Sequence, residues 1–174
     1  MQKTKSMLRC ISLLILVFSY TYGQGLPVTE GVNAALDKNL ELLSKALLEM
    51  DAKTALSFYA EDYISYGSFA EPVDLNKYGE HLTEDLKYCS IRGCQVVPPD
   101  ETILKRWQAG GDIYELGTYG FTQTGDPLKP YTSLQRGHYL RMWKKVGDEF
   151  KMHFYMNQLQ YHIDIPQSMS AENN

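Results

Sequence analysis

Apolar residues recur at helical spacing in the segment that follows Pro27. The apolar positions are Val32, Leu36, Leu40, Leu43, Leu47 and Met50. Steps of three and four residues place these side chains on one face, so the pattern predicts a long amphipathic helix that starts at Thr29 and Glu30. Asp51 is suited to cap the N-terminus of a second, short helix over 52–59.

Two further elements are predicted before residue 89. Residues 61–67 are rich in residues that favour strands and end in glycine, which predicts a short strand and a turn. Asp74 is expected to cap a third helix that ends near Tyr88.

From residue 89 the chain favours extended structure. The predicted strands cover 89–97, 102–108, 114–123, 138–145 and 150–159. The sequences at 110–112 and 146–149 are turns that join consecutive strands, and 124–131, with its glycine and prolines, is a longer loop. Helices first and strands after predict an α+β domain.

The last hairpin is predicted in register if Gly147 and Asp148 are its two turn residues. One face then pairs Trp143 with Met152, Arg141 with Phe154 and Tyr139 with Met156, while the other pairs Met142 with His153, Leu140 with Tyr155 and His138 with Asn157. The first face is strongly apolar, and the second mixes apolar and polar groups. We therefore expect both faces to be covered, one by helices and the other by a second subunit.

The first 23 residues have the order of a secretory signal peptide. Lys3, Lys5 and Arg9 precede an apolar run over 11–18, which is followed by small and polar residues up to Gly23. The apolar run is too short for a membrane anchor, which needs about 20 residues. We expect a secreted protein without membrane anchoring, in which residues 24–174 form a single domain.

Removal of that segment makes the protein more acidic. It takes three of the 17 basic residues and none of the 21 acidic ones, so the net charge changes from −4 to −7. This charge argues against nucleic acid and against anionic membrane surfaces as partners.

Cys89 and Cys94 are the two cysteines that remain after Cys10 leaves with the signal peptide. In an oxidising compartment they are expected to form a disulfide that fixes a turn. A redox-active pair or half of a metal site are the alternatives, but the spacing differs from that of a CxxC motif.

Three stretches carry a resemblance to a known superfamily: LSFYAEDY at 56–63, GDIYELGTY at 111–119 and GHYLRMWKKVGDEFKM at 137–152. Their order and spacing resemble the nuclear transport factor 2-like superfamily. The likeness is to a branch of unknown function, related to the association domain of calcium/calmodulin-dependent kinase II and to SnoaL-like polyketide cyclases. It covers nearly the whole chain after the signal peptide.

This resemblance implies a cone-shaped domain. A curved antiparallel sheet would wrap around two or three N-terminal helices and enclose a central pocket, and homodimers would form through the sheet. The superfamily includes isomerases, cyclases, dehydratases and proteins without catalysis, so the fold does not imply one chemistry. The residues that we expect to line the pocket are Tyr63, Tyr66, Tyr119, His138, His153, Tyr155 and Asn157.

Candidate catalytic groups are few. Related enzymes often place an Asp where this chain has Tyr155, and an unperturbed tyrosine is a poor base at neutral pH. His138 or His153 is the alternative base. A zinc site would need these two with His162 or His81, but the four are scattered, and neither a phosphate-binding loop nor a nucleophile motif is present. We expect no cofactor and no metal.

The leading hypothesis is a secreted, dimeric domain that binds a small apolar ligand or associates with a partner protein, without catalysis. The first alternative is an isomerase or cyclase-like enzyme with His138 or His153 as its base. The second is a structural component of an extracellular matrix or secretion.

Overall fold

The computed structural model describes residues 25–67, 71–92, 100–123 and 131–166. It confirms the predicted α+β fold, with the helices ahead of the long strands. The elements in chain order are β1 (Leu26–Pro27), α2 (Glu30–Leu48), α3 (Ala52–Leu56), β2 (Tyr59–Tyr66), β3 (Val73–Asp74), α4 (Leu75–Arg92), β4 (Asp100–Ala109), β5 (Asp112–Gln123), β6 (Tyr131–Val146) and β7 (Glu149–Pro166).

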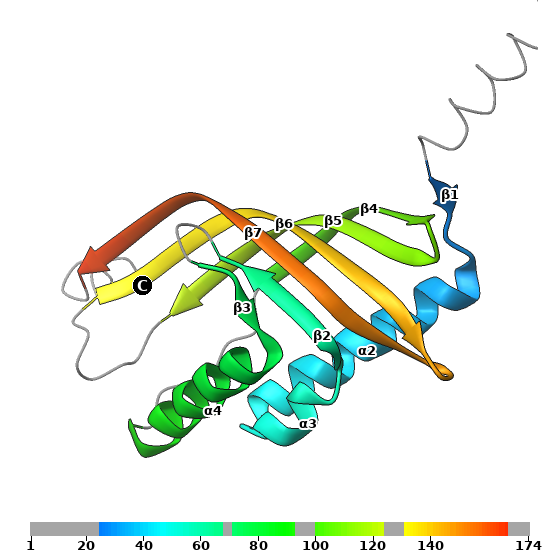
Figure 1. Cartoon of the computed structure of the whole chain (residues 1–174). Coiled ribbons are helices and arrows are strands. Elements are labelled where there is room, and N and C mark those ends of the chain that lie inside the picture. Colours follow the sequence, from blue (N-terminus) through cyan, green and yellow to red (C-terminus); the bar gives the residue numbers. More distant parts are fainter. Residues whose placement is uncertain (1–24, 68–70, 93–99, 124–130, 167–174) are drawn as a thin grey trace, which may run out of the picture.

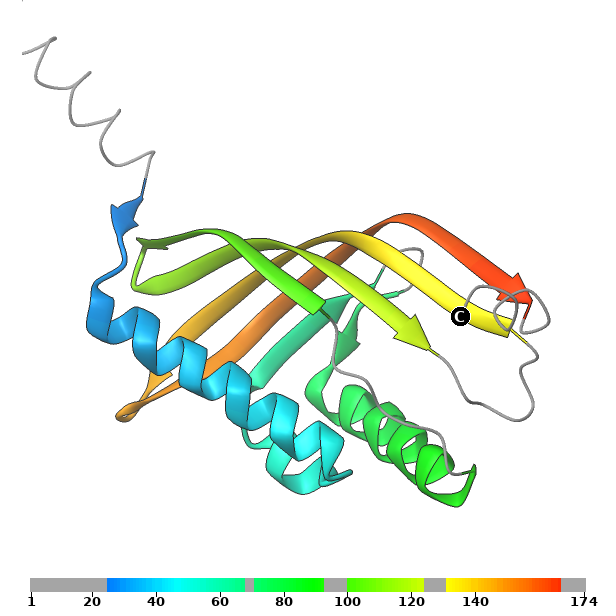
Figure 2. The ribbon, with the colours of Figure 1, turned by 180° about the vertical axis from the view of Figure 1, so that it is seen from behind.

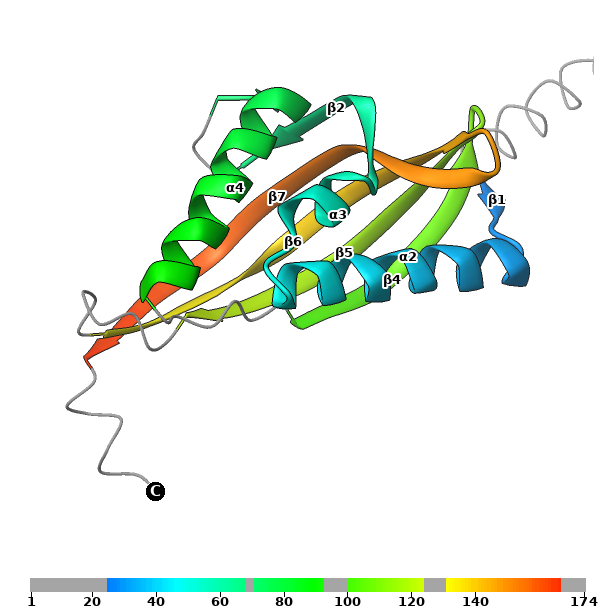
Figure 3. The same cartoon turned by 90° about the horizontal axis from the view of Figure 1, so that it is seen from below.

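Within the described residues the strands form one sheet of seven, in the order β1-β4-β5-β6-β7-β2-β3. Every neighbouring pair is antiparallel except β2 and β7, which are parallel, so the sheet is mixed where the resemblance implied an antiparallel one. The sheet is strongly curved, and α2, α3 and α4 lie on its concave side (Figures 1 and 3). Seen from behind, the long strands arch over the helices (Figure 2). The three helices thus cover the concave face of the sheet (Figures 2 and 3).

The helix boundaries follow local chemistry. Met50 has a positive φ of 58°, which ends the first helical segment shortly after Leu48. The carboxylate of Asp51 then accepts a hydrogen bond from the backbone N–H of Thr54 at 3.0 Å, which confirms the predicted N-cap of α3.

Helix α4 is longer than predicted. It continues through Arg92, so Cys89 is helical and the prediction of a strand from residue 89 was wrong for residues 89–92. Cys94, residues 124–130 of the predicted loop at 124–131 and the signal peptide lie outside the described residues, and the disulfide and the secretion stay predictions. Across the described segments, no helix is long and apolar enough to span a membrane.

The core lies where the concave face meets α2. Ile113, Trp143 and Met152 are register partners on β5, β6 and β7, and they pack with Leu36 and Leu43 of the helix. Trp143 is fully buried. The predicted pairing of Trp143 with Met152 is therefore confirmed.

Beyond that pair the register differs from the prediction. A bulge at His153 shifts the strand by one residue, so Arg141 lies opposite Tyr155 instead of Phe154, and His138 lies opposite Gln158 instead of Asn157. A bulge adds one residue to one strand and increases its bend and twist. The added bend accords with the curvature of the sheet over the helices.

Candidate functional site

A cavity of about 350 Å³ opens between the concave face of the sheet and helices α2 and α4. This is the size range of small-molecule sites. Helix α2 and Met152 provide aliphatic side chains, and β2, α4 and β7 provide tyrosines. The residues that line the cavity are Leu40, Leu43, Ser44, Leu47, Tyr59, Tyr63, Ser65, Tyr66, Gly67, Tyr78, Glu101, Arg141, Met152, Tyr155 and Asn157.

Three of these tyrosines form a compact group, which we call the tyrosine cluster: Tyr59, Tyr63 and Tyr78. Their ring centroids are 4.6 to 5.2 Å apart. The hydroxyls of Tyr59 on β2 and Tyr78 on α4 share a hydrogen bond of 3.0 Å. The cluster therefore joins α4 to the sheet at the cavity wall.

Burial keeps four of the cavity tyrosines neutral. Desolvation raises the pKa of Tyr59 well above its ordinary value, and it also raises the pKa of Tyr63, Tyr78 and Tyr155. These hydroxyls keep their protons at physiological pH. They can donate hydrogen bonds but cannot act as bases.

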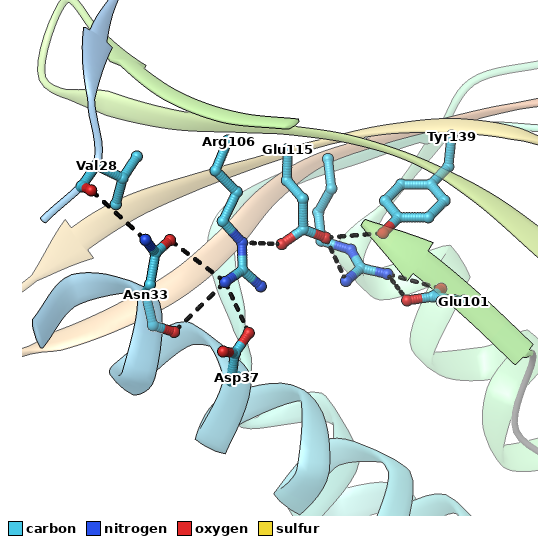
Figure 4. A network of polar contacts seen from close by, with 8 residues as sticks. Val28, Asn33, Asp37, Glu101, Arg106, Glu115 and Tyr139 are labelled. Atoms are coloured by element: carbon cyan, nitrogen blue, oxygen red, sulfur yellow. Dashed lines mark hydrogen bonds and ion pairs between the residues drawn. The ribbon is translucent and has the colours of Figure 1, made fainter. Parts of the chain in front are cut away.

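A line of alternating charges runs from the helix surface to the cavity, and we call it the charged chain: Asp37, Arg106, Glu115, Arg141 and Glu101 (Figure 4). Arg106 bonds the exposed Asp37 through Nη1 and Glu115 through Nε, each at 2.7 Å. Arg141 donates to Glu115 Oε1 at 2.9 Å and to both oxygens of Glu101 at 2.8 and 2.7 Å. Glu115 is fully buried at the centre.

A bulge in β4 makes this arrangement possible. Glu101 and Arg106 are five positions apart, so in a regular strand their side chains would point to opposite faces. The register shift between Ile103 and Lys105 adds one residue, and both side chains reach the concave face, opposite Tyr119 and Glu115 respectively.

Arg141 stays charged although it is buried. Burial by itself disfavours its charge, but Glu101 and Glu115 more than offset this effect and raise its pKa. Its guanidinium carbon lies 4.7 Å from the ring centroid of Tyr139 and 5.7 Å from that of Tyr155, which adds cation–π attraction. Its Nε has no hydrogen-bond partner among the described residues.

The charges at the cavity wall are therefore already compensated. Glu101 and Arg141 are the charged residues among those that line it, and they are paired with each other. In the described parts of the chain, no group of three or more His, Cys, Asp or Glu residues could hold a metal ion. The site is suited to bind a molecule by apolar contact and by hydrogen bonds from neutral hydroxyls.

The structure separates the predicted pocket residues into two groups. Tyr63, Tyr66, Tyr155 and Asn157 line the cavity. Tyr119, His138 and His153 do not belong to its lining.

The two histidines lie in different surroundings. His138 is in register with Thr118 and Gln158, and its Nε2 is 2.6 Å from Gln160 Nε2. His153 lies in the bulge of β7, where its Nε2 is 3.5 Å from Asp112 Oδ2.

Sequence reasoning missed Glu101, Arg141 and Tyr78 as cavity residues. A signal existed for Arg141, because it alternates with Tyr139 and Trp143 on the face predicted to be apolar. An arginine in such a row indicates a buried ion pair. No comparable signal marks Glu101, whose orientation depends on the bulge.

Comparison with known proteins gives structural likeness only. No family model matches the sequence, and no curated protein matches it. A hexachlorocyclohexane dehydrochlorinase from Novosphingobium barchaimii is similar in structure with a TM-score of 0.62 and 9% identity, over 78% of this chain and 90% of that one. A ketosteroid isomerase-like protein from Erwinia carotovora atroseptica has a TM-score of 0.55 and 12% identity, over 74% and 95%.

A third solved structure has no assigned function. It is a nuclear transport factor 2-like protein from Shewanella oneidensis, with a TM-score of 0.53 and 12% identity, over 72% of this chain and 97% of that one. At identities this low, the structural similarity supports a shared fold and does not identify an activity.

Proposed function

We propose, from the nuclear transport factor 2-like fold that this chain has, that it is a binding protein for a small, largely apolar molecule held in the cavity between α2 and the sheet. The observation that carries the proposal is the lining. Aliphatic side chains of α2 face tyrosines of β2, α4 and β7, and the charged residues at the wall are paired with each other. Small-molecule sites combine apolar walls with a few placed polar groups in this way.

Names of structural neighbours agree with this ligand class. Hexachlorocyclohexane and ketosteroids, which appear in two of those names, are apolar ring compounds. The ligand class that the cavity lining favours thus also appears in the names of two proteins of similar fold.

Acid–base catalysis by a histidine is less well supported. A base must lie within hydrogen-bond reach of the bound molecule, and neither His138 nor His153 is among the residues that line the cavity. We therefore favour binding over an isomerase or cyclase activity.

Secretion and dimerisation complete the proposal. The sequence of residues 1–23 supports export. A row of partly exposed apolar side chains on the convex face of the sheet, Leu116, Leu140 and Met156, supports a homodimer formed through that face.

Native mass spectrometry of the protein purified from its own source tests the function. We expect a mass that exceeds that of the chain by one small organic molecule, which is lost under mild activation. Denaturing spectra of the same sample give the mass of the chain itself and report whether the signal peptide has been removed. Absence of any retained molecule, together with failure of apolar compounds to bind, would reject the ligand-binding function.

A further inference from the structure

The tyrosine cluster contains a hydrogen-bond donor for which the described residues provide no acceptor. Tyr59 and Tyr78 have one hydroxyl proton each, and one proton is sufficient for the 3.0 Å bond between their oxygens. The second proton is therefore available to a third partner. Both residues line the cavity, so a bound molecule can be that partner.

The donor belongs to a neutral group. The rings of Tyr59 and Tyr63 pack at 4.6 Å and those of Tyr59 and Tyr78 at 5.1 Å, and Tyr59 is 9% exposed. Burial disfavours the tyrosinate form at such positions. The neutral hydroxyls of the cluster can consequently donate a hydrogen bond to an acceptor oxygen of the ligand, but they carry no charge that could balance the charge of an ionic ligand.

The charges at the wall already compensate one another. Arg141 donates to two carboxylates, Glu101 and Glu115, and Glu115 is also bonded to Arg106. An anion near the unpartnered Nε of Arg141 would add a third negative charge to one guanidinium, and a cation beside Glu101 would compete with Arg141 for that carboxylate. Burying an ion without a partner is costly.

Resting on the proposed binding function, we infer that the ligand is an uncharged ring compound with a carbonyl-type oxygen, which accepts the spare proton of the Tyr59–Tyr78 hydroxyl pair. The aliphatic side chains of α2, such as Leu43 and Leu47, then contact the apolar body of the molecule.

Four probes that share one diphenyl frame test this inference: benzophenone, diphenylmethane, diphenylacetate and diphenylmethylammonium. Their dissociation constants are measured by ligand-observed NMR on the purified protein. Because one hydrogen bond contributes about 0.5–1.5 kcal/mol, we expect benzophenone to bind about 2- to 13-fold more tightly than diphenylmethane. Both ions should bind more weakly than the ketone.

The double variant Tyr59→Phe/Tyr78→Phe removes both hydroxyls and keeps the rings. It should bind benzophenone and diphenylmethane equally, and unchanged binding of diphenylmethane shows that the cavity is intact. Tyr119→Phe is the matched control, because Tyr119 is a buried tyrosine outside the cavity lining. It should keep the preference for the ketone.

The outcomes separate this inference from the binding function itself. Three results would overturn the inference and leave the binding function in place. They are equal affinity of the unaltered protein for ketone and hydrocarbon, a preference for the ketone that survives in the double variant, and tightest binding of either ion. Failure of all four probes to bind overturns the inference, and only together with the absence of any retained molecule in the native mass spectrum does it also reject the binding function. If the double variant does not fold, the four affinities of the unaltered protein still decide whether the cavity prefers the uncharged ketone over the hydrocarbon and the two ions.

Discussion

Gly117 on β5 leaves the space that the ring of Tyr139 on β6 occupies. The two residues are direct register partners, and a Cβ atom at Gly117 would stand 2.5 Å from the Tyr139 hydroxyl oxygen. Tyr139 is 1% exposed, and its hydroxyl donates to Glu115 at 3.1 Å. The missing side chain at Gly117 thus allows Tyr139 to reach the centre of the charged chain.

The substitution Gly117→Ala tests this relationship. The ring of Tyr139 cannot move away freely because it is buried and hydrogen-bonded, so we expect a loss of about 1–3 kcal/mol in the free energy of unfolding. Urea denaturation measures it. In the background of Tyr139→Ala the same glycine substitution should cost much less, and equal costs in both backgrounds would show that the ring is not the obstacle.

Glu115 should be far more important for stability than a surface carboxylate. Glu115→Gln keeps the shape of the side chain but removes the charge that faces Arg106 and Arg141, so buried positive charge loses part of its compensation. We expect a loss of about 3–5 kcal/mol in the free energy of unfolding. The matched control is Glu49→Gln, which removes an exposed partner of Lys45 at 3.8 Å and should cost less than about 0.5 kcal/mol. Similar losses of stability for both variants would contradict a stabilising role of Glu115 in the charged chain.

The cavity tyrosines predict instability at high pH. Burial raises the pKa of Tyr63 and Tyr155 above the ordinary value of 10.0, so above pH 10 the unfolded chain loses tyrosine protons that the folded chain keeps. The unfolded state then binds fewer protons, and the free energy of unfolding falls as the pH rises. The stabilisation that results from the raised tyrosine pKa values is fully present below pH 10.

Tyrosinate absorbance recorded together with circular dichroism checks the prediction. The ionisation of the buried tyrosines should coincide with the loss of ordered structure. Full ionisation of all tyrosines while the circular dichroism signal remains native would contradict it. The double variant Tyr59→Phe/Tyr78→Phe, which has fewer buried hydroxyls, should show a shallower fall in stability above pH 10.

The elements of this fold are largely readable from the sequence, whereas the site depends on features that periodicity does not show. Helical spacing located α2, and the glycine-containing turns located the hairpins, because both signals are local. Cavity residues depend on which face each strand residue takes. The bulges in β4 and at His153 reverse that alternation, and a single extra residue leaves no mark in a pattern of period two.

Cavity residues that depend on contacts between distant segments of the chain also cannot be predicted from the sequence pattern. Tyr78 reaches the cavity only because α4 packs beside β2, and its contact with Tyr59 joins residues 19 positions apart. Tyr63 and Tyr155 were expected in the pocket as members of an aromatic set, but the same set also included Tyr119, which is not part of the lining. Composition identifies an aromatic interior and leaves the choice among aromatics to tertiary packing.

The convex face of the sheet provides a test of the proposed homodimer. Leu116, Leu140 and Met156 are register partners in one row across β5, β6 and β7, and Leu116 is 37% exposed in the single chain. In a dimer formed through this face, Leu116→Glu would place a carboxylate without a partner in the interface. We expect it to weaken the dimer by about 100-fold or more.

The same substitution at Leu48 is the matched control for that test. Leu48 is an exposed leucine, 56% accessible, at the C-terminal end of α2, away from the convex face. Sedimentation equilibrium should therefore find Leu48→Glu as dimeric as the unaltered protein and Leu116→Glu monomeric at the same concentration. If Leu116→Glu is as dimeric as Leu48→Glu, the subunits do not meet through this row. If the unaltered protein is itself monomeric, the partly exposed row of Leu116, Leu140 and Met156 requires another explanation.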